Sequence, residues 1–307
     1  MKAISYAEYG DPSVLSLTEV PDPKVGPGEV LIRVRSASVN PVDWKIVAGY
    51  LDPLMNVDLP AIPGWDVSGV VEQVGLDTPE FEVGDEVMAY ARKDWVKGGS
   101  YAELVAAPVR TVAKKPAALD WHQAAGLPLA GLTAYQLLTR LGTKSGDTVL
   151  VHAAAGGVGI LAVQIAKALG ARVIGTASER NHDVLRDLGV EPVTYGEGLA
   201  DRVRELAPDG VDVVTDFVGG VLDVTTAVLA EGGRHGSVVE GEVQQSGGLY
   251  MWVRPDADDL AALGALVDEG KLTVPVASVF PLERTADAFT ESATGHVRGK
   301  VVISVSE

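Results

Sequence analysis

A glycine-rich segment between a predicted strand and a predicted helix limits what this chain can fold into more than any other feature. Val149-Leu-Val-His152 predicts a short buried strand, and residues 160–167 have the pattern of a buried helix. Between them lies Ala153-Ala-Ala-Gly-Gly-Val-Gly159. A tight turn from a strand into a helix presents the unpaired amides of the helix N-terminus, which bind phosphate well. The segment therefore predicts a dinucleotide-binding βαβ unit.

Within this turn the small residues match the dinucleotide fingerprint position by position. Gly156 and Gly159 take the second and third glycine positions, which let backbone approach a pyrophosphate and let the helix pack on the strand. Ala154 holds the first glycine position, where alanine can replace glycine if the backbone is not left-handed. Gly157 and Val158 complete the expected cofactor-binding loop. The alternative is a glycine-rich loop that serves close packing only.

The chain continues with further units of the same kind. Short β-branched runs alternate with segments of helical periodicity, which is typical of a parallel sheet connected by crossover helices. The expected strands are residues 148–152, 172–176, 190–195, 211–215 and 234–239, and the expected helices are residues 162–169, 182–188, 199–206, 222–230 and 256–269. The pattern predicts a Rossmann domain with a doubly wound parallel sheet.

The end of the second of these strands bears on which dinucleotide is bound. An acidic residue at this point normally accepts hydrogen bonds from the ribose of NAD. Here Ser178 stands at the strand end and Arg180 follows, and a hydroxyl with a guanidinium suits a 2′-phosphate better than a bare ribose. The sequence therefore favours NADPH. Alternatively, Ser178 caps the next helix and Arg180 lies in solvent, and Glu179 between them fits either cofactor.

The first part of the chain predicts a different domain, mainly antiparallel β. Residues 30–35 alternate apolar and charged side chains, residues 67–74 form a second strand-like run, and Pro and Gly precede both. Residues 274–279 and 299–305 are strand-like again and are expected to rejoin this domain. The fold class is α/β, with a β domain at residues 1–122 and 270–307 and a Rossmann domain at residues 123–269.

Composition excludes several classes of protein. With 47% hydrophobic and 22% charged residues, the chain is an ordinary globular protein. Its 25 Lys and Arg against 42 Asp and Glu give a net charge of −17, which repels phosphate backbones and anionic lipids, so neither nucleic acid nor membrane is an expected partner. The chain has no Cys, which fits a reducing cytoplasm, and Glu8 interrupts the apolar run that a signal peptide needs.

Five further segments, taken with the glycine turn, resemble a known family. They are Asn40-Pro-Val-Asp-Trp-Lys45, Ile62-Pro-Gly-Trp-Asp-Val-Ser-Gly-Val-Val-Glu-Gln-Val-Gly75, Gly99-Ser-Tyr-Ala-Glu103, Leu127-Pro-Leu-Ala-Gly-Leu-Thr-Ala134 and His296-Val-Arg-Gly-Lys300. In this order they resemble the zinc-independent medium-chain dehydrogenase/reductases, with the quinone oxidoreductases and alkenal or enone reductases as the closest branch. The resemblance spans nearly the whole chain. It implies a GroES-like domain built from both chain ends, a Rossmann domain, NADPH and a homodimer.

Zinc can be judged from the residues themselves. The zinc-dependent relatives carry Cys ligands and a Gly-His-Glu segment, whereas this chain has no Cys and has Gly64-Trp65-Asp66. Its five histidines, at positions 122, 152, 182, 235 and 296, form no pair at ligand spacing. We therefore expect no bound metal. His152, directly before the glycine turn, is either a cofactor contact or a hydrogen-bonding residue at the strand end.

The resemblance also implies which residues act at the nicotinamide. Asn40 and Lys45 would be catalytic and would face that end of the cofactor, where the Lys45 cation stabilises an enolate or hydroquinone anion. Asp43 is a possible ion-pair partner that would give Lys45 a structural role instead. Thr133 resembles the residue beneath the nicotinamide, and is otherwise a buried hydroxyl bonded within its helix.

Three more residues are assigned to the cofactor by the same resemblance. Tyr195 resembles the tyrosine that reaches the adenosine phosphate, although an aromatic side chain packing on the sheet gives the same pattern. Arg298 and Lys300 resemble a closing basic pair near the cofactor, although exposed hairpin charges would look alike in sequence.

These observations together predict a metal-free, NADPH-dependent oxidoreductase. It would transfer a hydride to a small-molecule quinone or to the double bond of an α,β-unsaturated carbonyl, a reaction that depends mainly on alignment of the reactants. One rival is a pathway-specific enoyl reductase. The other is an NADPH-binding structural or regulatory protein without turnover, which cofactor oxidation with quinones and enones would distinguish.

Overall fold

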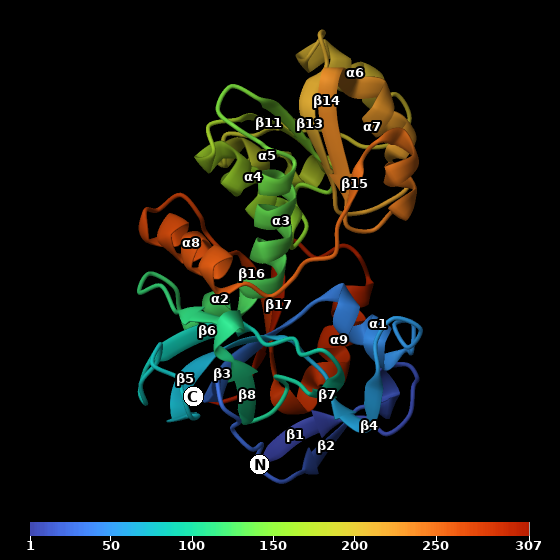
Figure 1. The fold of residues 1–307 in the computed structure, drawn as a ribbon. Coiled ribbons are helices and arrows are strands. Elements are labelled where there is room, and N and C mark those ends of the chain that lie inside the picture. Colours follow the sequence, from blue (N-terminus) through green and yellow to red (C-terminus); the bar gives the residue numbers. More distant parts are fainter. Residues whose placement is uncertain (307) are drawn as a thin grey trace. The chain divides into compact units, whose positions relative to one another are not determined.

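Two large β-sheets organise this computed structural model, which describes residues 1–306. Each sheet belongs to one of two compact units (Figure 1). The first unit comprises residues 1–132, 255–268 and 274 onward, and the second comprises residues 133–254 and 269–273. The sequence-based division differs at three segments. It assigns residues 123–132 and 255–268 to the Rossmann domain, whereas they lie in the first unit, and it assigns residues 270–273 to the β domain, whereas they lie in the second unit.

The sheet of the first unit has seven strands and is mainly antiparallel. Its order is β16 (Val276–Pro281), β17 (Lys300–Ser304), β3 (Glu29–Val39), β5 (Asp66–Val74), β6 (Glu86–Tyr90) and β9 (Val112–Lys114), and β8 (Leu104–Pro108) also pairs with β3. Val301 lies opposite Val39 in the β17–β3 pairing. The last strand of the chain therefore returns to the sheet formed by the first part, as its strand-like pattern predicts.

Smaller elements complete the first unit. Two pairs of strands stand apart from the main sheet, β1 (Lys2–Ser5) with β2 (Ser16–Glu19) and β4 (Val57–Ile62) with β7 (Val96–Gly98). The helices are α1 (Pro41–Val47), α2 (Trp121–Gly126), α8 (Ala257–Asp268), α9 (Thr285–Ala293) and the beginning of α3 (Pro128–Arg140), with 3-10 turns at Pro12–Val14, Val109–Thr111 and Leu282–Arg284.

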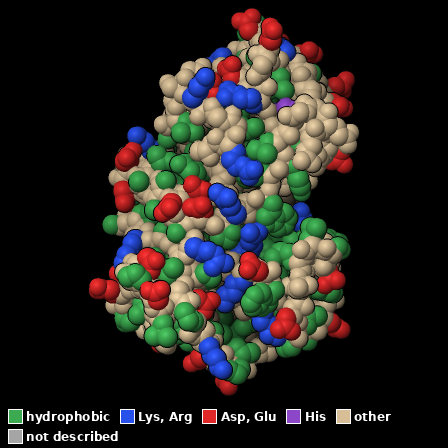
Figure 2. Space-filling view, in the orientation of Figure 1, with side chains coloured by type: hydrophobic (Ala, Val, Ile, Leu, Met, Phe, Trp, Pro, Cys, Tyr) green, Lys and Arg blue, Asp and Glu red, His purple; other side chains and the backbone are tan. Residues whose placement is uncertain are grey.

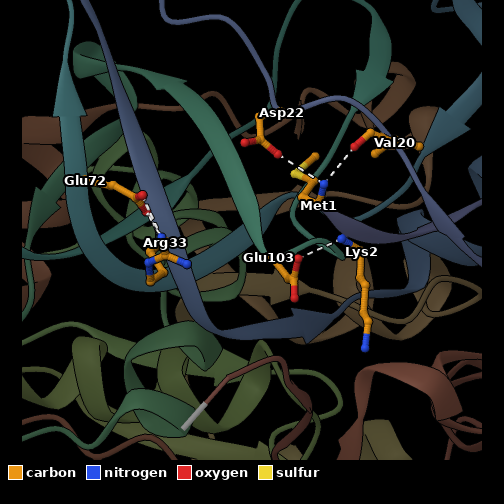
Figure 3. Close-up of polar contacts among 7 residues, drawn as sticks. All are labelled: Met1, Lys2, Val20, Asp22, Arg33, Glu72 and Glu103. Atoms are coloured by element: carbon orange, nitrogen blue, oxygen red, sulfur yellow. Dashed lines mark hydrogen bonds and ion pairs between the residues drawn. The ribbon is translucent and has the colours of Figure 1, made fainter.

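The core of this unit is formed by apolar side chains at alternate positions of its strands. Val30, Ile32 and Val34 of β3 are fully buried, whereas Arg33 is exposed and pairs with Glu72 (Figure 3). Each buried valine or isoleucine side chain contributes roughly 1.5–3 kcal/mol relative to an exposed one. This alternation is the pattern from which the sequence predicts a half-buried strand.

Polar contacts fix the first residues of the chain to this unit (Figure 3). The N-terminal ammonium of Met1 donates to the carbonyl oxygen of Val20 at 2.8 Å and lies 3.1 Å from a carboxylate oxygen of Asp22. The amide of Lys2 donates to Glu103 Oε2 at 2.7 Å. These contacts hold β1 in place beside residues that lie far away in the sequence.

The sheet of the second unit is entirely parallel and has the strand order of a Rossmann fold. Its order is β12 (Glu191–Val193), β11 (Arg172–Thr176), β10 (Thr148–Val151), β13 (Val211–Asp216), β14 (Leu229–Ser237) and β15 (Leu249–Tyr250). The connecting helices are α4 (Gly159–Ala168), α5 (His182–Asp187), α6 (Leu199–Leu206) and α7 (Leu222–Val228), with 3-10 turns at Glu179–Asn181 and Gly241–Ser246. The predicted α/β fold class is confirmed.

Two strands of this sheet differ from the sequence-based prediction. β14 begins at Leu229 instead of residue 234 and ends at Ser237, so Val239 lies in the loop beyond it. β15 has only two residues, too few to give an alternating pattern in sequence. Its pairing to β14 supplies the sixth position of the sheet.

The surface carries both signs of charge. On the face drawn in Figure 2, acidic and basic side chains are interspersed among apolar ones. On this face no single acidic field is visible, although the whole chain has a net charge of −17. Among residues 1–306, no helix is both long enough and apolar enough to cross a membrane.

Candidate active site

The glycine turn joins the end of β10 to the start of α4 in the second unit. Ala153 is left-handed, with a φ of 55°, whereas Ala154 is not, so Ala154 meets the condition for replacing the first glycine. A Cβ at Gly159 would lie 2.1 Å from the carbonyl oxygen of Ala153. Only glycine allows the helix to begin this close to the strand. The packing role predicted for the third glycine is therefore present.

Backbone contacts with the neighbouring strand hold the turn in shape. The amide of Ala153 donates to Thr176 Oγ1 at 3.0 Å, and the amide of Ala154 donates to the carbonyl oxygen of Thr176 at 2.9 Å. At the start of α4 the N-cap is Val158, which offers no side-chain cap. The first amides of the helix are therefore not satisfied by a capping side chain, which suits a phosphate group.

The strand end of β11 carries the residues predicted to choose between cofactors. Ser178 is half-buried and makes no side-chain cap to the following 3-10 turn, so the capping alternative is not what the structure shows. Asn181 Nδ2 donates to Ser178 Oγ at 3.3 Å instead. Glu179 and Arg180 are both exposed.

Tyr195 lies at the same edge of the sheet. Val193 of β12 pairs with Thr176 of β11, so Tyr195 and Ser178 each follow a paired position by two residues. The Tyr195 side chain is 58% exposed. Such exposure does not fit an aromatic side chain packed on the sheet, and leaves this residue accessible to a ligand.

Two other predicted residues of the second unit are buried. His152 is 1% exposed, and its Nε2 lies 3.2 Å from Thr225 Oγ1. Burial lowers the pKa of His152 to about 4, so the ring is neutral at neutral pH, and its contact with Thr225 fits the hydrogen-bonding alternative. Thr133 lies in α3 with 4% exposure.

The first unit contains a buried charge cluster, formed by Asn40, Asp43, Asp66, Tyr101 and Lys300. All five side chains are at most 4% exposed. Asn40 is its centre, because its carboxamide Nδ2 donates to Asp66 Oδ2 at 2.8 Å and its Oδ1 accepts a hydrogen bond from Lys300 Nζ.

Each carboxylate of the cluster also accepts hydrogen bonds from its surroundings. Asp66 Oδ2 accepts from Ser38 Oγ at 2.8 Å, and Asp66 Oδ1 accepts from the amide of Leu129 at 2.8 Å. Asp43 Oδ2 accepts from the amide of Asn40 at 2.7 Å and from Tyr101 Oη at 3.0 Å. These bonds connect β3, β5, α1 and α3.

Burial dominates the electrostatics of the cluster. It raises the pKa of Asp43 to about 7, raises the pKa of Asp66, and lowers the pKa of Lys300. The opposite charges act against these shifts, since Lys300 favours the ionised form of both carboxylates. Two carboxyl groups share one ammonium, so the cluster tends to retain a proton.

The predicted residues of the first unit fall into different environments. The alternative of an exposed hairpin pair is wrong for Lys300, which is 4% exposed, whereas Arg298 is exposed. Lys45 is half-buried outside the cluster, with Nζ 5.5 Å from the ring centroid of Trp44. The Asp43 carboxylate accepts hydrogen bonds from the amide of Asn40 and from Tyr101 Oη. These bonds, and not the ion pair considered for Lys45, account for its position.

Asp66 and Tyr101 are site residues that the sequence reasoning missed. Asp66 begins the strand Asp66–Val74, whose first four residues are buried, and Lys300 begins the strand Lys300–Ser304, whose first four residues are buried. A charged residue at the start of a buried strand is the signal that could have indicated such a cluster. The partner of each charge could not be inferred, since Asn40 and Lys300 are 260 positions apart.

Comparisons with known proteins agree with this geometry. Residues 26–117 match the family described as alcohol dehydrogenase GroES-like domain, and residues 188–303 match the one described as zinc-binding dehydrogenase. The NADPH-dependent alkenal/one oxidoreductase of Arabidopsis thaliana chloroplasts is 37% identical, over 99% of this chain and 79% of its own length. The chain therefore belongs to the medium-chain dehydrogenase/reductase family, in the branch of the quinone oxidoreductases and alkenal reductases.

Solved structures of relatives superpose on the whole chain. The quinone oxidoreductase from Coxiella burnetii has a TM-score of 0.86 and 37% identity, covering 100% of this chain and 99% of its own. Mycobacterial Rv1454c, solved in complex with NADPH, has a TM-score of 0.84 and 32% identity, covering 99% of this chain and 100% of its own.

The donor set does not fit the zinc that one family description names. Across residues 1–306, no three His, Cys, Asp or Glu side chains are grouped so that they could hold a metal ion. Both carboxylate oxygens of Asp66 already accept hydrogen bonds, from Ser38, Asn40 and the amide of Leu129. Lys300 in the same cluster would repel a dication.

Proposed function

We propose that this protein is an NADPH-dependent oxidoreductase that transfers a hydride to a quinone or to the double bond of an α,β-unsaturated carbonyl. The observation that carries the proposal is the glycine turn, which leads from β10 into an α4 terminus without a side-chain cap. Ser178 at the neighbouring strand end supports NADPH over NADH. The two relatives named for alkenals and for quinones support the substrate class.

The chain offers groups for each charged part of the cofactor. The amides of residues 157–159 would bind the pyrophosphate, with Ala154 and Gly156 forming the turn before them, where the Gly156 amide donates to the carbonyl oxygen of Ala153 at 2.9 Å. Ser178 and Arg180 would bind the 2′-phosphate, and Tyr195 the adenosine phosphate. Bound NADPH supplies the hydride from its nicotinamide.

At the reacting end, the chain would position the substrate and stabilise charge. The Lys45 ammonium would stabilise the negative charge that develops on the substrate oxygen as its carbon accepts the hydride. Thr133 and Arg298 would contact the cofactor. Asn40 caps α1, the helix that carries Lys45, and its carboxamide is already bonded to Asp66 and Lys300. We therefore assign Asn40 and Lys300 a positioning role.

Replacing Lys45 tests the charge-stabilising role. We expect Lys45→Ala to lower kcat on the order of tenfold or more, because the developing oxyanion loses a cation, with little change in the unfolding temperature of this half-buried site. Lys45→Arg keeps the charge and should retain more activity. Steady-state kinetics at saturating NADPH measure both, and equal kcat in parent and Lys45→Ala protein would return Lys45 to a structural role.

Two substitutions at the β11 strand end test the cofactor preference. Ser178→Asp should narrow or reverse the preference for NADPH, because a carboxylate repels the 2′-phosphate and accepts bonds from a ribose. Arg180→Ala should raise the Kd for NADPH by about tenfold and leave that for NADH nearly unchanged. Titrations of both cofactors at one fixed ionic strength give the result. Tighter NADH binding by the parent protein would instead indicate that Glu179 holds the ribose.

Activity is tested by measuring NADPH oxidation with a panel of quinones and enones. We expect saturable turnover with at least one member of the panel. NADPH binding without turnover across the whole panel would favour a structural or regulatory protein. Turnover with only one biosynthetic enoyl substrate would favour the pathway-specific reductase.

We also propose a homodimer in the cytoplasm. The short strand β15 lies at the edge of the six-stranded sheet, with Tyr250 38% exposed and Trp252 42% exposed beside it. An exposed apolar strand edge is well suited to pair with a second copy. Light scattering tests the dimer, and cell fractionation tests the compartment.

A further inference from the structure

The carboxyl edge of the second unit's sheet contains a second organised feature beside the glycine turn. The strand order reverses between β10 and β13, and in open α/β sheets ligands bind outside the carboxyl ends of the strands at such a point. The glycine turn follows β10. The loop of residues 217–220 follows β13, and the loop of residues 238–240 follows β14. These two loops therefore continue the edge at which a dinucleotide would bind.

Asp216 organises the first of these loops. It ends β13, is 3% exposed, and its Oδ1 accepts hydrogen bonds from the amides of Val218 at 2.8 Å and Gly219 at 2.9 Å. Its Oδ2 accepts from Ser237 Oγ at 2.6 Å. The carboxylate thus turns the loop back over the strand end and bonds to the neighbouring strand as well.

Ser237 does the same for the second loop. It lies opposite Asp216 in the β13–β14 pairing and is fully buried. While its hydroxyl donates to Asp216, its Oγ accepts from the amides of Val239 at 3.0 Å and Glu240 at 2.9 Å. Four loop amides are therefore held by two buried side chains.

The two loops also touch each other. The amide of Gly220 donates to Glu240 Oε2 at 3.2 Å, and a Cβ at Gly219 would lie 3.2 Å from Val239 Cγ1. With their amides turned inward, the loops leave Val218 55% exposed and Val239 47% exposed. Neighbouring apolar side chains at this edge suit the uncharged, flat parts of a dinucleotide.

We propose that Asp216 and Ser237 are positioning residues, which hold residues 217–220 and 238–240 in the form that contacts the bound dinucleotide through Val218 and Val239. The inference rests on the proposed function, since it assumes that NADPH binds at this edge. It assigns a role to a buried pair whose side chains bond each other and the amides of the two loops. Loss of the pair would loosen the loops and weaken cofactor binding.

The first test compares Ser237→Ala with Ser68→Ala. Ser68 is also fully buried, and its Oγ donates to the carbonyl oxygen of Trp121 in the first unit. We expect Ser237→Ala to raise the Kd for NADPH by about tenfold, with kcat at saturating NADPH and the KM for the quinone nearly unchanged. Ser68→Ala should lower the unfolding temperature without changing that Kd. An unchanged Kd in folded Ser237→Ala protein would overturn the inference.

Hydrogen exchange separates positioning from general destabilisation. In Ser237→Ala protein, exchange should become faster in residues 217–220 and 238–240 and stay unchanged within β10 and β13. Faster exchange across the whole sheet would contradict a local role.

An exposed variant keeps the inference testable if Ser237→Ala does not fold. Val239→Asp leaves the buried pair intact and places a charge at the proposed contact, so it should weaken NADPH binding by about tenfold. Unchanged binding would contradict the inference. If instead the parent protein binds no NADPH or turns over no quinone or enone, the proposed function has failed and not this assignment alone.

Discussion

Replacing Lys300 with methionine should lower the free energy of unfolding by about 3–5 kcal/mol. Lys300 is 4% exposed and is the cation of a buried cluster that also holds Asp43 and Asp66. Methionine keeps the length and apolar stem of the side chain, so the main loss is the charge. Two buried carboxyl groups would then face each other without a cation. Denaturant unfolding of the parent and variant proteins measures the difference.

A surface lysine gives the matched control. Lys97 pairs with Asp58 at 3.3 Å, but the two side chains are 44% and 66% exposed. Lys97→Met should therefore change stability by no more than about 1 kcal/mol. Adding Asp66→Asn to Lys300→Met should recover part of the loss, because one buried carboxylate is removed. Equal effects of Lys300→Met and Lys97→Met would show that the buried cluster does not stabilise the fold in this way.

The second large effect is expected for Asp43→Asn, which should remove part of the pH dependence of the free energy of unfolding. Burial raises the pKa of Asp43 to about 7, whereas the unfolded chain has the ordinary value of 3.8. Between these values the folded protein holds a proton that the unfolded chain has released. The contribution of Asp43 is therefore full below about pH 4 and is lost as the pH rises toward 7. Three pKa units correspond to about 4 kcal/mol.

The carboxamide introduced by Asp43→Asn would accept the same bonds from Asn40 and Tyr101, and it cannot titrate. The free energy of unfolding of the variant, relative to the parent, should therefore rise between pH 4 and pH 7. The two proteins should differ least near pH 4, which is an internal control. A difference that is constant over this range would contradict a titrating Asp43.

The parent protein alone would hide much of this slope, because His152 opposes it. Burial lowers the pKa of His152 from 6.5 to about 4, so its contribution is present above pH 6.5 and is lost as the pH falls toward 4. This change amounts to about 3 kcal/mol. The stabilising contribution of Asp43 instead grows as the pH falls, so the two contributions partly cancel. The difference between variant and parent is therefore more informative than either profile.

The sequence predicts the second unit better than the first because its signals are local. The strand, glycine turn and helix of residues 148–168 are contiguous, and each glycine has a role that follows from its place in the turn. β15 was missed because two residues carry no periodicity, and its place depends on pairing to β14.

The buried charge cluster could not be predicted because it is non-local. Asn40 is 26 positions from Asp66 and 260 from Lys300, and nothing in either neighbourhood indicates the other. The resemblance led to Asn40 and Lys300 as cofactor contacts. The structure shows that both side chains are buried and bonded to each other. From the sequence pattern alone, a buried Lys300 cannot be distinguished from a basic residue in an exposed hairpin.

The most direct test of the proposed activity follows the transferred hydrogen itself. NADPH carrying deuterium at C4 of its nicotinamide, on one face and then on the other, is turned over with an enone, and the product is analysed by mass spectrometry and NMR. The proposed reaction predicts one deuterium at the β-carbon of the saturated product, from one face only, and a solvent-derived proton at the α-carbon. A product without deuterium from either form would contradict direct hydride transfer from NADPH.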